Sequence, residues 1–206
     1  QFSKLSWHSR NKIIINNKTS WISLPVFHKS NDQLINDTLI VSNKKNLNKI
    51  LKTIKQNYSK TKFYNIYSDE FENILLKCFS FKFLDEFNIE IIKWIIDKIG
   101  IKTKVFKSSD LKINEARSNR IIKICEKFKT KNYLSAYGAL DYLKKDLKLF
   151  AKRKISISLQ NYQTVNYKQL QKNFDGYVSI LDMLFNEGPN TLNLIRKSRK
   201  DKYIIS

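Results

Sequence analysis

The sequence predicts an α/β fold in which helices flank a mixed β-sheet and a β-hairpin lies near the start of the chain. Three observations support this class. A β-branched run and an alternating run flank an Asn-rich turn before residue 25, and apolar residues recur at helical spacing between residues 46 and 100. After residue 100, short extended runs alternate with helical segments, which is typical of an α/β sheet. With 206 residues and no repeat or linker, we expect one domain over residues 1–206.

The hairpin is predicted within residues 7–25. A β-branched run at 12–15 precedes a polar turn at 16–19, and the segment 21–24 alternates in polarity. A further short strand is expected at 38–42.

Helices are predicted next. Apolar residues follow helical spacing over residues 46–58, and Ser68-Asp69-Glu70 offers cap-type residues for a second helix that runs to Cys78. A third helix is expected over residues 85–100, where Gly100 is a natural helix end.

Strands and helices alternate in the rest of the chain. A polar, basic helix is expected at 190–200 after the stop at Gly188-Pro189, and a flexible basic tail at 195–206. The other expected segments are strands at 102–106, 133–135 and 154–160, a loop at 108–110, and helices at 114–129, 139–149 and 179–186.

The charge of the chain is strongly positive, with 39 Lys and Arg against 18 Asp and Glu and a net charge of +21. Such a field attracts nucleic acid, anionic lipid head groups or phosphorylated small molecules. The alternative is codon usage, because Lys, Asn and Ile are abundant throughout, as in genomes rich in A and T. We expect no specific nucleic-acid partner, and we keep peripheral association with an anionic membrane open.

Several classes of enzyme are disfavoured by missing signatures. The chain contains no GxGxxG, GxxxxGK[ST], HExxH or GxSxG motif, and Cys78 and Cys125 are far apart. We therefore expect no metal site and no tightly bound cofactor. We expect a cytoplasmic location, with the inner face of the membrane as the alternative. The reasons are the isolated cysteines, the lack of an apolar run of about 20 residues and the lack of a signal peptide.

The first candidate site is the segment Trp7-His8-Ser9-Arg10-Asn11. A histidine, an arginine and an amide close together can place a proton acceptor, a fixed cation and a hydrogen-bonding group beside an anionic or carbonyl substrate. The alternative is an exposed polar strand edge.

The second candidate site is the stretch from Tyr133 to Tyr142. Ser135 and Gly138 stand between an extended segment and a helix, where small residues let backbone N–H groups approach a phosphate. An ordinary strand–turn–helix junction is the alternative.

Two further clusters lie near the end of the chain. Tyr167 and Gln169 offer phenol and amide groups suited to a sugar or nucleotide rim, and the alternative is amphipathic surface. Asp182 and Asn186 are one helical turn apart on one face of a helix whose apolar members belong to the core, and Ser179 is a suitable N-cap.

In order and spacing, these clusters resemble the WbqC-like protein family from residue 1 to about residue 194. The departures are Ser9 in place of Asn, Lys168 in place of Pro, and an opening Gln-Pro-x-Tyr-x-Pro-Trp-type segment of the family that would precede Gln1. We expect that segment to supply an edge of the pocket. The stretches that carry the resemblance are Phe2-Ser3-Lys4 with Trp7 and Arg10-Asn11, Trp21 to Val26, Ile124-Cys125, Tyr133-Leu134-Ser135 with Gly138 and Tyr142, Tyr167 with Gln169, and Phe174 to Gly188.

The resemblance implies an enzyme of bacterial surface-polysaccharide (O-antigen) biosynthesis. The expected reaction is the transfer of glycine or another acyl group from an activated donor to the amino group of a nucleotide-linked sugar. The chemistry needs a base for the amine proton and donors for the oxyanion. We expect His8 and Asp182 to be catalytic. The expected substrate-binding residues are Arg10, Asn11, Trp21, Ser135, Gly138, Tyr142, Tyr167, Gln169 and Asn186.

Two other classes of function stay open. A basic nucleic-acid-binding domain would show oligonucleotide affinity that falls steeply with salt. A non-catalytic scaffold of a glycan assembly complex would bind anionic liposomes without responding to nucleotide sugars.

Overall fold

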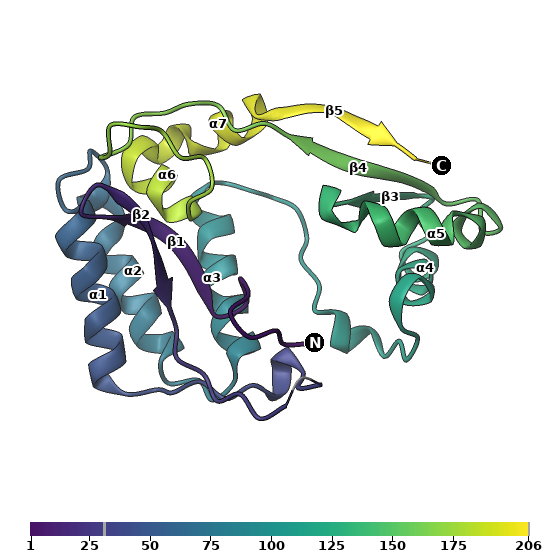
Figure 1. Ribbon diagram of the computed structural model, residues 1–206, viewed down its shortest axis with the longest axis horizontal. Coiled ribbons are helices and arrows are strands. Elements are labelled where there is room, and N and C mark those ends of the chain that lie inside the picture. Colours follow the sequence, from purple (N-terminus) through teal and green to yellow (C-terminus); the bar gives the residue numbers. More distant parts are fainter. Residues whose placement is uncertain (31, 206) are drawn as a thin grey trace. The chain divides into compact units, whose positions relative to one another are not determined.

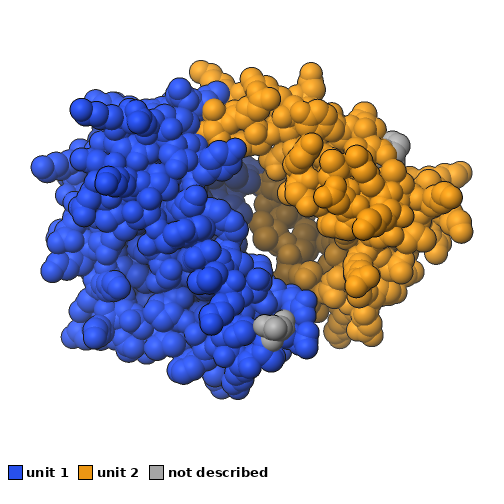
Figure 2. Space-filling model, viewed as in Figure 1, with its two compact units in different colours: residues 1–102, 165–194 blue, residues 103–164, 195–206 orange. Residues whose placement is uncertain are grey.

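The computed structural model describes residues 1–30 and 32–205 (Figure 1). The chain divides into two compact units (Figure 2): unit 1 holds residues 1–102 and 165–194, and unit 2 holds residues 103–164 and 195–206. The predicted α/β class, with an N-terminal hairpin and a mixed sheet, is confirmed. The expectation of a single domain stays a prediction.

Unit 1 begins with the predicted hairpin, in which β1 (Arg10–Ile15) pairs antiparallel with β2 (Lys18–Ser23). The two turn residues, Asn16 and Asn17, have φ values of 51° and 57°. Asparagine tolerates this left-handed conformation, which gives a two-residue turn the twist of the strands that flank it. Ile13 and Ile14 are both buried.

Three helices follow in unit 1: α1 (Lys44–Tyr58), α2 (Tyr64–Cys78) and α3 (Leu84–Lys98) (Figure 1). In α1, the Asn43 side chain accepts a hydrogen bond from the Asn46 N–H, so the helix begins two residues before the predicted start. Helix α3 ends before Gly100, which has a φ of 77°.

Two expectations for this half need correction. Ser68-Asp69-Glu70 lies inside α2 and does not cap it, because the helix already begins at Tyr64. The strand expected at 38–42 is reduced to isolated bridges, which join Leu39 to Phe83 and Ile40 to Val26.

Helix α6 (Ile180–Glu187) completes the core of unit 1. Its N-cap Ser179 accepts a hydrogen bond from the Leu181 N–H, as predicted, and the Ser179 N–H donates to the Lys12 carbonyl in β1 (2.7 Å). The Phe185 ring packs against the rings of Tyr58 (5.4 Å between centroids) and Tyr64 (5.2 Å). The start of α6 is therefore fixed against the hairpin and its end against α1 and α2.

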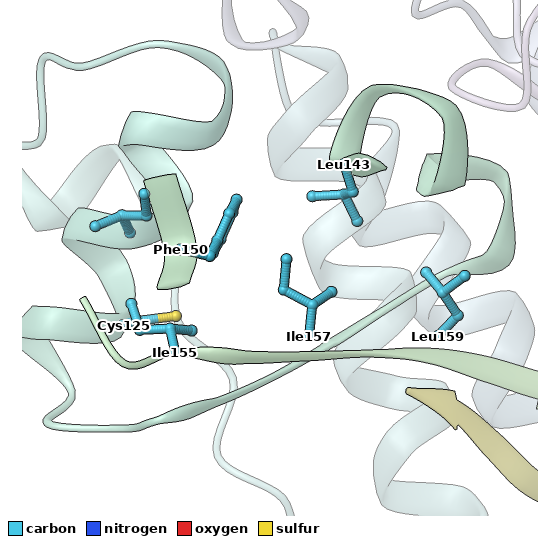
Figure 3. Packing of buried hydrophobic residues seen from close by; sticks show 7 residues of the cluster. Cys125, Leu143, Phe150, Ile155, Ile157 and Leu159 are labelled. Carbon is cyan, nitrogen blue, oxygen red and sulfur yellow. The ribbon is translucent and has the colours of Figure 1, made fainter. Parts of the chain in front are cut away.

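Unit 2 contains a parallel strand–helix–strand arrangement. Strand β3 (Asn132–Ser135) is followed by α5 (Leu140–Ala151) and β4 (Ser156–Tyr162), and β5 (Arg199–Ile204) pairs antiparallel with β4, in the order β3-β4-β5. Helix α4 (Arg117–Lys127) precedes β3. The buried core residues of unit 2 are Ile122, Cys125, Leu143, Phe150, Ile155, Ile157 and Leu159 (Figure 3).

Two expectations fail in unit 2. Residues 102–106 do not form the predicted strand. Val105 and Phe106 are 57% and 56% exposed, so this apolar pair does not belong to a buried strand. A short 3-10 helix, Ser108–Leu111, occupies the expected loop.

The C-terminal end also differs from the expectation. The basic helix predicted at 190–200 is α7 (Thr191–Lys197), which ends three residues early. The tail expected to be flexible contains β5, which pairs with β4. Among the described residues, no helix has the length and apolar character needed to cross a membrane.

Candidate functional site

A cavity of about 440 Å³ lies inside unit 1, within the size range of small-molecule sites. It is bordered by the hairpin, by α1, α2 and α3, and by the first turn of α6. Its wall is mainly apolar and includes Ile50, Ile54, Phe71, Leu75, Ile91 and Ile95. Its polar members are His8, Ser9, Arg10, Asn11, Ser23, Asn88 and Ser179. We call it the Arg10 cavity.

Arg10 is the charged residue of this cavity. Its guanidinium carbon lies 3.9 Å from the centroid of the Trp21 ring, and the Trp7 and Trp21 rings are 4.8 Å apart. Arg10 Nε is buried and has no hydrogen-bond partner among the described residues. A buried donor left unpaired costs about 1–3 kcal/mol. The cation is therefore held in place by an aromatic ring and retains an unused donor for an anionic acceptor.

His8 stands next to Arg10 in the lining. Its Nδ1 accepts a hydrogen bond from the Ser3 N–H (3.3 Å), which places the proton of the neutral ring on Nε2. Burial lowers the pKa of His8 below its usual value, so the ring is neutral near pH 7. The Asn88 side chain of α3 donates to the His8 carbonyl (2.9 Å) and positions this segment.

Two other residues of the hairpin, Asn11 and Trp21, were predicted to bind substrate. Asn11 lines the cavity, but its side chain is exposed and its Oδ1 accepts from the neighbouring Lys12 N–H (2.8 Å). Trp21 does not border the cavity itself and contributes through the face that it presents to Arg10.

Asp182 is the centre of a separate hydrogen-bond network in unit 1. Its Oδ2 accepts from the Tyr167 hydroxyl (2.7 Å) and from Gln169 Nε2 (2.9 Å), and the Asn186 side chain donates to the Asp182 carbonyl (2.7 Å). Gln169 also binds the backbone of Asp175 in both directions. Four residues that sequence reasoning assigned to substrate binding or catalysis thus join the 167–175 segment to α6.

Asp182 is completely buried and does not border the Arg10 cavity. Burial raises the pKa of its carboxyl group, while the hydrogen bonds from Tyr167 and Gln169 oppose that shift. The Tyr58 hydroxyl also faces this carboxyl group and opposes the shift of its pKa, although no described residue makes a hydrogen bond of ordinary geometry to Asp182 Oδ1. The geometry therefore favours a positioning role for Asp182 over direct contact with a substrate.

The remaining predicted site residues, Ser135, Gly138 and Tyr142, belong to unit 2. Ser135 is buried at the end of β3 and accepts from the Tyr133 hydroxyl (3.3 Å). The space next to the Cα atom of Gly138 is empty, since an added Cβ would have no atom within 4 Å. Tyr142 lines a hollow of about 440 Å³ together with Arg117, Lys145 and Asp146.

A larger hollow of about 700 Å³ lies beside the hairpin turn in unit 1. Its acidic member, Asp175, already accepts hydrogen bonds from the Tyr177 N–H and the Thr19 hydroxyl, and both lower the pKa of its carboxyl group. We favour the smaller Arg10 cavity as the site because it combines a buried unused donor with a neutral histidine.

Within residues 1–30 and 32–205, no group of three His, Cys, Asp or Glu side chains is placed to hold a metal ion. Cys78 and Cys125 are buried thiols. Burial raises the pKa of Cys78 to about 12 and raises that of Cys125, so neither is an activated nucleophile.

Sequence reasoning missed Asn88 and the apolar wall of the cavity. Asn88 lies within a segment whose spacing predicts an amphipathic helix. Its polar side chain next to the apolar Phe87 and Ile91 is the signal that could have indicated a site residue. The wall residues looked like ordinary helix core, because spacing alone does not distinguish a packed face from a cavity wall.

Comparison with known proteins now assigns the chain. The model of the WbqC-like protein family matches residues 1–194, and the chain belongs to this family. A similar protein is the uncharacterised protein Rv1507c of Mycobacterium tuberculosis, 28% identical over 202 residues, which are 97% of this chain and 86% of the relative. No solved structure matches the chain.

Proposed function

We propose that the chain is an N-acyl or aminoacyl transferase that acts on the amino group of a nucleotide-linked amino sugar, with the Arg10 cavity as its substrate site. Membership of the WbqC-like family fits a role in polysaccharide biosynthesis. The observation that carries the proposal is the buried, unpaired Nε of Arg10 beside a neutral His8. An activated acyl or aminoacyl donor is the second substrate, and no tightly bound cofactor takes part.

In this reaction, the sugar amine attacks the acyl carbonyl carbon. A C–N bond forms, the bond from the carbonyl to the leaving group breaks, and the amine loses a proton. Neutral His8 takes up that proton at Nδ1, where the incoming amine replaces the long contact with the Ser3 N–H (3.3 Å). Arg10 binds a phosphate of the sugar nucleotide or the developing oxyanion.

The apolar wall strengthens this arrangement. Ile50, Ile54 and Phe71 exclude water from one side of the cavity, and a guanidinium in a region of low dielectric attracts an anion more strongly than one in bulk water. Asp182 takes the positioning role, because it holds α6, whose first turn borders the cavity.

The reaction is tested by incubating the full chain with nucleotide-linked amino sugars and activated acyl donors and measuring the product mass. The expected result is a sugar whose mass has increased by one acyl group.

We expect Arg10→Met to lower kcat/KM about 100-fold, the typical loss when one hydrogen-bond donor to the transition state is removed. Lys12→Met, which removes a neighbouring cation outside the cavity lining, is the control and should keep turnover. Equal turnover of Arg10→Met and Lys12→Met would remove the proposed role of Arg10.

The pH dependence of turnover tests His8. A base must be unprotonated, and burial lowers the pKa of His8 from its usual value of 6.5. The value of kcat/KM should therefore rise with pH through a midpoint below 6.5 and then level off. His8→Gln should abolish this acidic limb. The control is His28→Gln, since His28 is exposed. A profile that His8→Gln leaves unchanged would show that another group accepts the proton.

A further inference from the structure

Positive charge is distributed unevenly between the two units. Unit 2 carries 20 Lys and Arg and 6 Asp and Glu in 74 residues, a net charge of +14, whereas unit 1 carries 19 and 12 in 132 residues, a net charge of +7. Five of the six arginines lie in unit 2, but only 4 of the 21 asparagines do. Codon usage rich in A and T would enrich Asn and Lys together, so it does not account for the excess of positive charge in unit 2.

Exposed apolar side chains accompany this charge in unit 2, and two of them, Phe106 and Phe128, pack against each other. Phe106 and Phe128 are 56% and 40% exposed, their ring centroids are 4.7 Å apart, and Val105 is 57% exposed. We call the surface formed by Lys104, Val105, Phe106, Lys107, Phe128 and Lys129 the Phe106–Phe128 patch. All six residues are exposed.

Hydrogen bonds hold the patch in shape. The segment after Phe106 is fixed to α4, because Arg120 Nη2 donates to the Ser108 carbonyl (3.4 Å) and Lys127 Nζ donates to the Leu111 carbonyl (2.9 Å). Glu126, an acidic neighbour of the patch, is bonded to Lys123 (2.9 Å), so its charge is already compensated.

We propose that the Phe106–Phe128 patch docks unit 2 onto an anionic lipid surface. The phenyl rings and Val105 would enter the boundary between head groups and acyl chains, and the lysines would bind lipid phosphates, as interfacial protein segments do. A single-stranded nucleic acid would stack on the Phe rings but would offer no apolar environment to Val105, so the lipid surface is the better match. This inference does not depend on the proposed transferase activity.

Sedimentation of the full chain with vesicles tests the proposal. The chain should bind vesicles that contain phosphatidylglycerol, bind much less to phosphatidylcholine alone, and dissociate at high salt. Lys104→Gln with Lys129→Gln should weaken binding about 25-fold, since each lysine near an anionic surface contributes about 1 kcal/mol. Phe106→Ser with Phe128→Ser should weaken it about tenfold or more, through loss of buried ring area.

The matched controls are variants in unit 1. Lys44→Gln with Lys45→Gln makes the same change in net charge on exposed residues of α1. Ile66→Ser removes an apolar side chain that is 65% exposed, and both control variants should bind as the unchanged chain does.

The proposal is overturned if phosphatidylglycerol vesicles fail to bind, or if the control variants lose as much affinity as the patch variants. It is also overturned if a single-stranded oligonucleotide displaces the vesicles while the Phe variants bind normally. Thermal melting of each variant verifies folding, and the lysine pair, being exposed, keeps the test decisive if the Phe pair unfolds.

Discussion

Asp182→Ala should destabilise the protein by about 3 kcal/mol, because it leaves the Tyr167 hydroxyl and the Gln169 amide buried without their acceptor. The same change should separate the 167–175 segment from α6, since Gln169 also binds Asp175. Urea unfolding followed by circular dichroism measures the loss. Asp69→Ala, at an exposed position in α2, should stay within about 0.5 kcal/mol of the unchanged chain. A loss below about 1 kcal/mol in Asp182→Ala would mean that the network contributes little.

Asp182→Asn distinguishes charge from shape at the same position. The remaining oxygen can still accept from Tyr167 and Gln169, while the amide takes the place of Oδ1. Because burial raises the folded pKa of Asp182, its protonation contributes stability below the unfolded value of about 3.9, and that contribution is lost as pH rises through the folded pKa. The unchanged chain should therefore lose stability relative to Asp182→Asn as pH rises. A difference in unfolding free energy that is independent of pH would contradict the assigned shift.

Gly188→Ala should cost about 4 kcal/mol, from two causes that add. Gly188 has a φ of 51° and a ψ of −121°, a backbone conformation that is strongly unfavourable for residues other than glycine. An added Cβ would also lie 2.5 Å from two atoms of the Phe63 ring, and the Phe63 N–H is bonded to the Phe185 carbonyl (2.9 Å), which holds that residue in place.

Two further variants separate these causes in thermal or urea unfolding. Phe63→Ala with Gly188→Ala removes the clash, so the double variant should lose less stability than the two single losses combined. Gly138→Ala is the matched control, because its Cβ would meet nothing within 4 Å, and it should change stability by about 1 kcal/mol at most. If Gly188→Ala and Gly138→Ala lowered the stability equally, the close approach of Gly188 to Phe63 at the end of α6 would not constrain the fold.

Local sequence signals predicted the elements whose causes are local. The Asn16-Asn17 turn, the Ser179 cap and the end of α3 before Gly100 each depend on one or two side chains and their backbone preferences. The strand predicted at 102–106 from its place after a helix is absent, because an extended segment forms a strand only if a partner strand is present, which short-range patterns do not reveal. Strand β5 was missed for the complementary reason, since its basic, exposed residues carry no alternation and its pairing with β4 is long-range.

The candidate site shows the same division. The grouping of His8, Arg10 and Asn11 followed from their positions in sequence, and all three line the cavity. Helical spacing predicted that Asp182 and Asn186 share one face of a helix, and the Asn186 side chain donates to the Asp182 carbonyl. The contacts of Asp182 with Tyr167 and Gln169, and its burial, are tertiary properties that spacing does not encode. The roles of Ser135, Gly138 and Tyr142 in substrate binding remain predictions within unit 2.

The central claim is that the Arg10 cavity binds a nucleotide-linked amino sugar. Nuclear magnetic resonance of the indole N–H groups tests it most directly, because Trp21 covers the Arg10 guanidinium at 3.9 Å. Titration with such a sugar nucleotide should shift the Trp21 signal saturably, and Arg10→Met should abolish the shift while the fold is retained. A Trp21 signal that does not move, or that moves equally in Arg10→Met, would contradict the assignment of this cavity as the substrate site.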